Sequence, residues 1–344
     1  MHDAGDRNQR ILFARRPVGT PVPADFGSDT TAVPTPGPGQ FLTRTLYLSL
    51  DPEYRRAMQA SDRPSSDRLN PGDVMSGDTL GQVLESRHPD YRPGECVVVH
   101  SGWQQFALSS GQRARRIDPA RAPLSSALGV LGIPGLAGYT GLIYMGEPRP
   151  GQTVLVSAPT GAVGCTAGQA ARLIGARAIG IAGTPEKCAY AVQALGYAEC
   201  VNYRAGDLDG QLKRACPEGV DVYFDNVGGE VLATVLPHLA AHARVILCGM
   251  SETYNTEPPL AGPFLGPVLS ARASLRGIIV QDHLQRLPEL EKVVGGWIRC
   301  GQFRYREDIS EGLASAPEAF CRLMRGENFG KALVRVAPEH QGAN

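Results

Sequence analysis

The chain has 344 residues, and its 34 Lys and Arg residues balance 34 Asp and Glu residues, so the formal net charge is zero. This balance gives no support to nucleic acid or an acidic membrane as a partner, because both attract strongly basic surfaces. The length is typical of two domains or one large domain. No apolar run reaches the roughly eighteen residues of a membrane-spanning helix. The first residues lack the apolar core of a signal peptide, so we expect a cytoplasmic protein with no membrane partner.

The eight cysteines are scattered along the chain, and none forms a C-x-x-C pair or lies near a histidine at metal-ligand spacing. A structural zinc site needs a cluster of soft ligands. We therefore expect no metal. Scattered cysteines in a cytoplasmic chain are usually small buried apolar residues.

The first third of the chain has the pattern of short strands. Residues 15–45 are rich in Pro, Gly and Thr, and residues 70–117 carry segments such as "GQVLES" and "ECVVVHSGWQQFALS" between turn residues. This pattern predicts an irregular β-rich domain. Residues 125–146, "SSALGVLGIPGLAGYTGLIYMG", then carry apolar residues at helical spacing, broken by Pro134.

From residue 152 onward, strand and helix patterns alternate, which predicts a parallel sheet with helices on both faces. The expected strands are 153–157, 178–182, 198–202, 220–224, 243–248 and 275–280. The expected helices are about 163–175, 186–195, 205–215, 229–239 and 283–299.

The C-terminal part predicts one helix, "EDISEGLASAPEAFCRLMRG", and one closing strand, "KALVRV", which could return to the first domain. We therefore expect a β-rich domain formed by residues 1–120 and 305–344 and an α/β domain formed by residues 121–304.

The first β/α unit contains the segment "VLVSAPTGAVGCTAGQ", in which a strand pattern precedes glycines 161, 164 and 168 and a helix pattern. Backbone N–H groups at a helix start attract an anion. Gly161 and Gly164 suit a tight turn and the close approach of a pyrophosphate, and Gly168 suits close packing of the helix on the sheet. With 41 glycines in the chain the spacing alone is weak. Its place in the first unit favours a dinucleotide site over a purely structural turn.

The end of the second expected strand indicates which dinucleotide is bound. An NAD site usually has an acidic residue there, about twenty residues beyond the glycines. This chain has Gly183 and Thr184 instead, with Lys187 within the next turn and Arg204 after the third strand. A missing anion and a nearby cation favour the 2′-phosphate of NADP. The alternative is that Lys187 is an ordinary surface lysine, compensated by Glu186.

Several blocks, in order along the chain, resemble one protein family. They include "GDVMSGDTLGQVLES", "VSAPTGAVGCTAGQAA", "GVDVYFDNVGGEVL", "VILCGMSETYN" and "GENFGKALVRV". They are similar to the zinc-independent medium-chain dehydrogenase/reductase proteins, in the branch of prostaglandin reductase, leukotriene B4 12-hydroxydehydrogenase and alkenal double-bond reductase. The resemblance covers most of residues 41–337. It implies an α/β fold, with a Rossmann-type doubly wound parallel sheet plus a β-rich, partly barrel-like (GroES-like) catalytic domain, and a homodimer.

The resemblance also implies a set of cofactor-binding residues. The loop Gly161, Ala162, Val163 and Gly164 would bind the pyrophosphate, and Lys187 and Tyr203 would contact the 2′-phosphate. The remaining implied cofactor contacts are Asn226, Cys248, Tyr254, Ile278, Ile279, Val280 and Asn328.

The resemblance implies a catalytic role for Tyr254. The family reaction sends a hydride from NADPH to the β-carbon of an α,β-unsaturated carbonyl compound, and negative charge develops on the carbonyl oxygen. A phenol aimed at that oxygen would stabilise the transition state. The alternative is that Tyr254 only hydrogen-bonds the ribose or caps a loop.

Three regions depart from the family pattern, and we expect all three to line the substrate pocket. Glu53 stands where a Tyr is usual, and Tyr54 is shifted by one position, which in an extended chain would point its ring the other way. Ala137 and Gly138 replace larger residues, and the loop 256–274 is unusually rich in Pro and Gly. Glu53 would bind a cationic substrate or relay protons, or it is a surface carboxylate.

The sequence therefore predicts an NADPH-dependent reductase of the C=C bond in a medium-sized apolar carbonyl compound. One alternative is another reaction, namely oxidation of a secondary alcohol or reduction of a quinone or imine in a biosynthetic pathway. A second alternative is an NADPH-binding protein without turnover. The homodimer would form through the edge strand near residues 275–280, since an apolar edge would otherwise stay exposed.

Overall fold

The computed structural model describes residues 7–59, 68–256 and 261–339, and the chain divides into two compact units. The first unit comprises Met1–Leu128, Glu307–Asn328 and Ala332–Asn344, and the second comprises Gly129–Arg306 and Phe329–Lys331. All eight cysteines are free thiols. Among the described residues, no helix combines the length and the apolar character needed to cross a bilayer.

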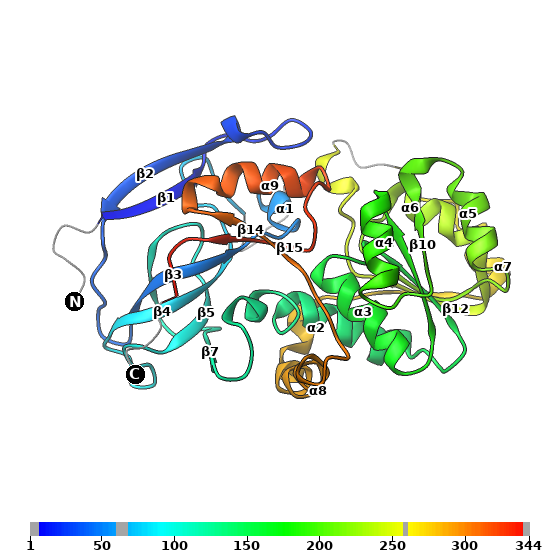
Figure 1. Cartoon of the computed structure of the whole chain (residues 1–344). Helices are drawn as coiled ribbons and strands as arrows, with labels where there is room; N and C mark the ends of the chain where they lie inside the picture. The colour runs from blue at the N-terminus through cyan, green and yellow to red at the C-terminus, as the bar shows by residue number, and fades with distance from the viewer. Residues whose placement is uncertain (1–6, 60–67, 257–260, 340–344) are drawn as a thin grey trace. The chain divides into compact units, whose positions relative to one another are not determined.

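A six-stranded parallel sheet forms the centre of the second unit (Figure 1). Its order, β10-β9-β8-β11-β12-β13, places the first and fourth strands of the unit side by side. This is the doubly wound order with a switch point between β8 and β11, and it confirms the predicted fold class. The strands are β8 (Thr153–Ser157), β9 (Arg177–Ala182), β10 (Glu199–Asn202), β11 (Val220–Asp225), β12 (Leu239–Leu247) and β13 (Ser274–Gly277).

The central strands are mostly apolar because helices cover both faces of a doubly wound sheet. Every residue of β8 is buried, and Leu155, Ile179 and Tyr223 belong to one core cluster. The helices are α3 (Ala162–Leu173), α4 (Pro185–Gln193), α5 (Leu208–Ala215), α6 (Gly229–Val235), α7 (Gly266–Ala271) and α8 (Leu287–Arg299), with short helical turns η4 (Tyr203–Ala205), η5 (Leu236–His238), η6 (Thr253–Asn255) and η7 (Val280–Arg286).

Pro134 begins a helix rather than breaking one. The segment 125–146 folds as the end of η2 (Leu124–Leu128), then α2 (Ile133–Thr140) and a π-helical segment, η3 (Gly141–Gly146). Pro134 lies in the first turn of α2. A proline is tolerated there because the N–H that it lacks would have no partner within the helix.

The first unit is built on a seven-stranded sheet with the order β14-β15-β3-β4-β5-β7, in which β6 also pairs with β3. A separate antiparallel pair, β1-β2, lies outside this sheet. The strands are β1 (Arg7–Phe13), β2 (Phe26–Ala32), β3 (Phe41–Ser49), β4 (Asp78–Ser86), β5 (Cys96–His100), β6 (Phe106–Ser109), β7 (Arg115–Ile117), β14 (Glu307–Glu311) and β15 (Lys331–Arg335). The helical elements are η1 (Pro23–Asp25), α1 (Tyr54–Ala57), η8 (Leu313–Ser315) and α9 (Ala316–Met324).

Two predicted elements have different limits in the structure. The expected helix after residue 301 begins only at Ala316, and Glu307–Glu311 form β14 instead, because β15 offers them a neighbouring strand. The expected strand 275–280 ends at Gly277. Its partner β12 ends at Leu247, whose carbonyl accepts the N–H of Ile278 at 3.1 Å, so no ladder remains for later residues. The strand "KALVRV" is confirmed as β15.

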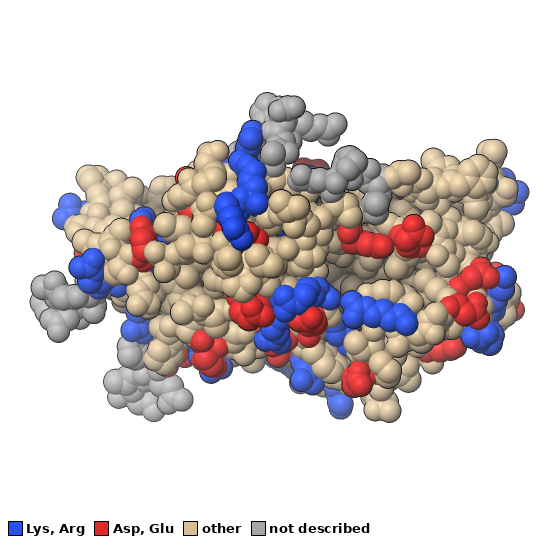
Figure 2. Space-filling view, turned by 90° about the horizontal axis from the view of Figure 1, so that it is seen from above, with Lys and Arg blue, Asp and Glu red and all other residues tan. Residues whose placement is uncertain are grey.

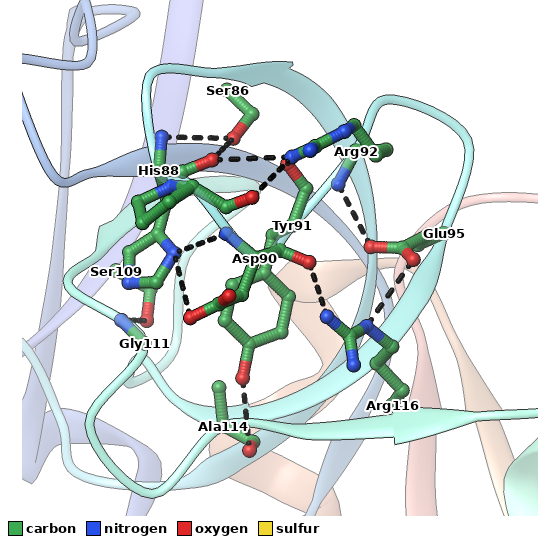
Figure 3. A network of polar contacts seen from close by, with 11 residues as sticks. Ser86, His88, Asp90, Tyr91, Arg92, Glu95, Ser109, Gly111, Ala114 and Arg116 are labelled. Atoms are coloured by element: carbon green, nitrogen blue, oxygen red, sulfur yellow. Dashed lines mark hydrogen bonds and ion pairs between the residues drawn. The ribbon is translucent and has the colours of Figure 1, made fainter.

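A polar network holds the loop between β4 and β5 (Figure 3). The Tyr91 hydroxyl donates to the Ala114 carbonyl at 3.2 Å, and the Arg116 guanidinium lies 4.9 Å from the centre of the Tyr91 ring. Arg116 also approaches Glu95 at 3.2 Å and donates to the Asp90 carbonyl. These contacts tie the loop to β7, and so they support the pairing of β4 with β5.

Charges on the face shown in Figure 2 are mixed. Blue and red groups lie near one another, separated by uncharged surface, which agrees with the zero net charge of the chain. On the described part of this face, no continuous field of one sign marks a polyanionic partner.

Candidate active site

The structure brings most of the predicted cofactor residues to one edge of the parallel sheet. Each follows the carboxyl end of a strand, and in a doubly wound sheet these ends form the ligand-binding edge. In the order of the strands in the sheet, they are Tyr203 after β10, Lys187 after β9, the loop 161–164 after β8, Asn226 after β11, Cys248 after β12 and Ile278 after β13.

The start of α3 provides backbone donors for an anion. Gly161 is the N-cap and makes no side-chain capping bond, and the Cys165 N–H donates to its carbonyl at 2.8 Å. Ala162, Val163 and Gly164 form the first turn, whose N–H groups have no carbonyl four residues earlier within the helix. Together with the helix dipole, these donors fit a pyrophosphate.

Gly164 allows the loop to close tightly. A Cβ at this position would lie 2.9 Å from the carbonyl carbon of Ala158 and closer still to its oxygen. Ala158 itself has a φ of +53°, which is uncommon for a residue with a side chain. Any larger residue at 164 would displace backbone and, with it, the donors of the first turn.

Gly168 makes room for Tyr197, which sequence reasoning did not single out. A Cβ at Gly168 would lie 2.7 Å from Cε1 of Tyr197 and closer to Cζ and the hydroxyl oxygen. The Tyr197 hydroxyl donates to the Gly164 carbonyl at 2.8 Å. Gly168 was expected to let the helix pack on the sheet, but its close neighbour is this tyrosine from the turn before β10. This contact joins a glycine to an aromatic residue far away in the sequence, so no local pattern predicts it.

The start of α4 holds Lys187 beside the end of β9. The N-cap Thr184 accepts the Lys187 N–H on its hydroxyl oxygen at 3.3 Å, which places Lys187 at the third helical position. The Glu186 carboxyl bonds its own N–H and the Thr184 hydroxyl, and these bonds lower the pKa of Glu186. Glu186 is therefore engaged at the helix start.

Tyr203 covers the end of the second strand. A Cβ at Gly183 would lie 3.0 Å from Cε1 of the Tyr203 ring, so the absence of a side chain leaves space for the phenol. The Arg204 guanidinium lies 5.5 Å from the centre of the same ring. An aromatic ring, two cations and no acid at Gly183 or Thr184 fit a ribose that carries a 2′-phosphate.

A buried carboxyl organises the end of β11. Asp225 is fully buried and accepts hydrogen bonds from Ser157 Oγ at 3.0 Å and from the Tyr223 hydroxyl at 2.8 Å. The Gly228 N–H also donates to it at 3.1 Å. Burial raises the pKa of Asp225, whereas these bonds oppose the rise. Asn226 donates from Nδ2 to the Ser157 carbonyl at 2.7 Å.

Sequence reasoning missed Ser157 and Asp225. The available signal was a polar residue directly after an apolar run in two strands, in "VLVS" and "VYFD". Because β8 and β11 are neighbours at the switch point, these two residues meet and fix the backbone that presents Asn226.

Tyr254 lies in η6, close to the end of β12. The N–H groups of Cys248 and Gly249 donate to the Asp225 carbonyl at 2.8 and 3.1 Å, which ties the segment after β12 to the end of β11. The Tyr254 hydroxyl accepts the Met250 N–H at 3.2 Å. That bond occupies a lone pair of the phenol and not its proton, so it is compatible with donation to a substrate oxygen.

The segment Ile278–Val280 leaves the sheet after its last bond with β12. Ile278 is buried, whereas Ile279 is 61% exposed and Val280 begins η7. Consecutive residues of the predicted nicotinamide-binding segment thus differ strongly in exposure.

The remaining predicted residues belong to the first unit. Asn328 is half-buried between α9 and β15 and immediately precedes Phe329, whose ring meets Tyr190 of α4 edge-on at 5.2 Å.

Glu53 is exposed just before α1. Tyr54 is buried, its hydroxyl accepts the Asp78 N–H at 3.0 Å, and burial raises its pKa. Tyr54 begins a helical turn, so the expectation based on an extended chain was wrong.

Gly138 has a packing role in the structure. A Cβ there would lie 3.1 Å from Cβ of Thr166 and closer still to the carbonyl oxygen of Val163. The departure from the family pattern at Gly138 thus allows α2 to approach α3. Within the loop 256–274, residues 257–260 lie outside the described residues, and Gly266–Ala271 form α7.

The second unit has the doubly wound strand order, and its carboxyl edge presents the first turn of α3 together with Lys187 and Tyr203. Two family models match the chain, one described as the N-terminal domain of oxidoreductase over residues 9–117 and one as zinc-binding dehydrogenase over residues 162–294. In the part of the chain that the structure describes, no three His, Cys, Asp or Glu residues are grouped to hold a metal ion.

The chain is 44% identical to the NADPH-dependent curcumin reductase of Escherichia coli (strain K12), over 98% of this chain and 99% of that one. It is 37% identical to prostaglandin reductase 1 of Bos taurus, over 93% and 96% of the two chains. A crystal structure of CurA in complex with NADPH from Vibrio vulnificus is similar, with 38% identity, a TM-score of 0.91 and coverage of 96% of this chain and 100% of that one.

These matches define the chain as an oxidoreductase. It belongs to the zinc-independent medium-chain dehydrogenase/reductase family, in the branch of the curcumin, prostaglandin and alkenal reductases. The resemblance found in the sequence is confirmed.

Proposed function

We propose that this protein reduces the C=C bond of α,β-unsaturated carbonyl compounds with NADPH. It is an NADP(H)-dependent enzyme, and its relatives include proteins named NADPH-dependent curcumin reductase and 2-alkenal reductase (NADP(+)-dependent). The similarity to these reductases supports the substrate class. The structural observation that supports the coenzyme is the end of β9, where Lys187 and the Tyr203 ring adjoin Gly183 and Thr184 with no acid in the usual position.

The cofactor would lie along the carboxyl edge of the sheet. The first turn of α3 would bind its pyrophosphate, and Lys187 and Tyr203 would bind its 2′-phosphate. When bound, NADPH supplies the hydride that adds to the β-carbon of the substrate. The further proposed contacts are Asn226, Cys248, Tyr254, Ile278, Ile279, Val280 and Asn328.

Tyr254 would stabilise the enolate oxygen that forms as the hydride adds. Its phenol proton would be donated to that oxygen, while its lone pair accepts the Met250 N–H at 3.2 Å. Accepting one hydrogen bond strengthens the donation of another. Loss of one such donor from a well-formed site costs about 2.7–4 kcal/mol, or roughly 10²–10³ in kcat.

The reaction is tested by following NADPH absorbance with a panel of 2-alkenals and aryl enones, with product analysis to show a saturated carbonyl compound. Tyr254→Phe should lower kcat by roughly 10²–10³, with a much smaller effect on the Kd for NADPH because the ring is kept. If no enone oxidises NADPH, or if Tyr254→Phe retains full kcat, the assignment is wrong.

The coenzyme assignment is tested separately. Lys187→Ala should raise the KM for NADPH about tenfold to a hundredfold, because a hydrogen bond to a charged group contributes about 1.5–3 kcal/mol. The KM for NADH should change little, and Lys187→Arg, which keeps the charge, serves as the matched control. Equal changes for both coenzymes would refute a contact with the 2′-phosphate.

We also infer a homodimer in the cytoplasm. Strand β13 is an edge of the parallel sheet, and an edge presents unpaired backbone groups to a second copy. Phe264 and Leu269, which precede β13 in the chain, are 83% and 81% exposed. Exposed apolar side chains of this size favour contact with a second protein surface. Light scattering of the full-length protein should give twice the monomer mass, and a monomer at micromolar concentration would contradict the inference.

A further inference from the structure

Three polar side chains form a hydrogen-bonded chain at one end of the β4-β5 pair. Ser76 Oγ lies 2.9 Å from His100 Nε2, and His100 Nδ1 lies 2.7 Å from Asp78 Oδ1. Figure 1 shows β4 and β5, the strands that carry Asp78 and His100, in the first unit. None of the three residues is used by the proposed hydride transfer.

The sheet register brings these side chains together. Asp78 is the first residue of β4 and stands directly opposite His100, the last residue of β5, in the antiparallel ladder. Ser76 precedes Asp78 by two positions, which is the spacing of residues on one side of an extended chain. Between them, Gly77 faces Trp103, since a Cβ there would lie 2.8 Å from the Trp103 Nε1.

Backbone bonds on both sides of Ser76 hold its position. The Met75 N–H donates to the Ile11 carbonyl at 2.9 Å, and the Met75 carbonyl accepts the Trp103 N–H at 2.8 Å. The Gly77 carbonyl accepts the Gly102 N–H at 3.0 Å. Ser76 is thus presented by a segment that is hydrogen-bonded to two neighbouring parts of the unit.

The carboxylate determines the tautomer of the imidazole. An ionised Asp78 only accepts hydrogen bonds, so His100 Nδ1 carries the proton that points to it. Nε2 of the neutral ring then has a lone pair that accepts the Ser76 hydroxyl proton. The same nitrogens have the same roles in the serine–histidine–aspartate arrangement of acyl-transfer enzymes.

The arrangement is open to small reagents. The side chain of His100 is 46% exposed and that of Asp78 is 29% exposed, and Ser76 is partly exposed. Solvent also weakens electrostatic stabilisation of a developing oxyanion. The chemistry therefore suits an ester whose leaving group is good enough to need little of that stabilisation.

We propose that Ser76 is a nucleophile that accepts the acyl group of activated carboxylic esters, with His100 as its general base and Asp78 as the positioning residue. Ser76 Oγ attacks the ester carbonyl carbon and its proton passes to His100 Nε2. The bond from that carbon to the leaving oxygen breaks, and the same proton reaches the departing alcohol. Water then hydrolyses the acyl-serine by the reverse proton path and releases the carboxylic acid.

The test uses the full-length protein and p-nitrophenyl acetate. Wild type should release nitrophenolate and carry one acetyl group on Ser76, located by peptide mass spectrometry. Ser76→Ala should lose this acetylation and retain NADPH binding. His100→Ala should slow it about 10²-fold, the smaller end of the effect of a general base. Ser109→Ala is the matched control, because Ser109 Oγ accepts the Gly111 N–H at 3.1 Å and is also partly buried.

The proton transfer and positioning roles have their own readouts. Added imidazole should restore acetylation of Ser76 in His100→Ala, which a purely structural histidine would not show. Asp78→Asn should slow acetylation at least tenfold, since the imidazole loses the partner that sets its tautomer. Acetyl groups found only on lysines or thiols, or a wild-type rate on Ser76 in His100→Ala, would overturn the proposal.

Discussion

Replacing Gly168 by Ala tests the role of Tyr197 as the residue that packs against α3. The added Cβ would lie 2.7 Å from Tyr197 Cε1 and closer to Cζ and the hydroxyl, well inside the 3.0 Å that Cβ atoms essentially never cross. Tyr197 is only 3% exposed, and in a close-packed interior a buried ring is displaced only together with its neighbours. We therefore expect Gly168→Ala to destabilise the ligand-free protein.

The expected change in the free energy of unfolding is the sum of two losses and one gain. Overpacking costs about 1–3 kcal/mol. Displacing the ring also weakens the bond from the Tyr197 hydroxyl to the Gly164 carbonyl, 2.8 Å long, which contributes about 1 kcal/mol. The higher helix propensity of Ala returns about 1 kcal/mol. The net loss is about 1–3 kcal/mol, or roughly 2–12 °C in Tm for a unit of this size.

A double-mutant cycle gives the decisive comparison. Tyr197→Leu removes Cε1, Cζ and the hydroxyl, so in that background Gly168→Ala should gain up to about 1 kcal/mol from propensity alone. Urea unfolding of the wild type, both single variants and the double variant measures the change of sign. Equal destabilisation by Gly168→Ala in both backgrounds would refute the contact as the cause.

Two further variants test the supporting networks. Asp225→Asn should lower stability by about 1–3 kcal/mol, because Asn offers one acceptor oxygen to donors that include Ser157 Oγ and the Gly228 N–H, and chemical denaturation measures the loss. Tyr91→Phe should lower stability by about 0.5–1.5 kcal/mol through loss of the bond to the Ala114 carbonyl, with an unchanged KM for NADPH; a larger effect on KM than on Tm would contradict its structural role.

The parallel sheet was predictable because its strands carry their own signal. A strand covered on both faces is mostly apolar, so "TVLVS" and "RAIGIA" are recognisable without knowledge of their neighbours. The glycine loop was predictable for a similar reason, since Gly161 and Gly164 adjoin a strand and a helix in one short segment.

Long-range pairings could not be predicted from local patterns. The local pattern of Glu307–Glu311 predicts a helix. These residues form a strand because they pair with β15, which lies some twenty residues further along the chain. The meeting of Asp78 with His100 depends on the register of a ladder. The fit of Tyr197 into the space above Gly168 depends on side-chain packing, which a single sequence does not reveal.

The hydroxyl of Tyr197 connects the residues that precede β10 with the carbonyl of Gly164 in the glycine loop. Anyone who wishes to redesign coenzyme preference by grafting a segment from another reductase into the region from Gly183 to Arg204 would therefore also exchange an anchor of the glycine loop. A graft that retains this tyrosine, with Gly168 beneath it, can alter ribose selectivity on its own. A graft that discards it would weaken binding of either coenzyme before selectivity could be judged.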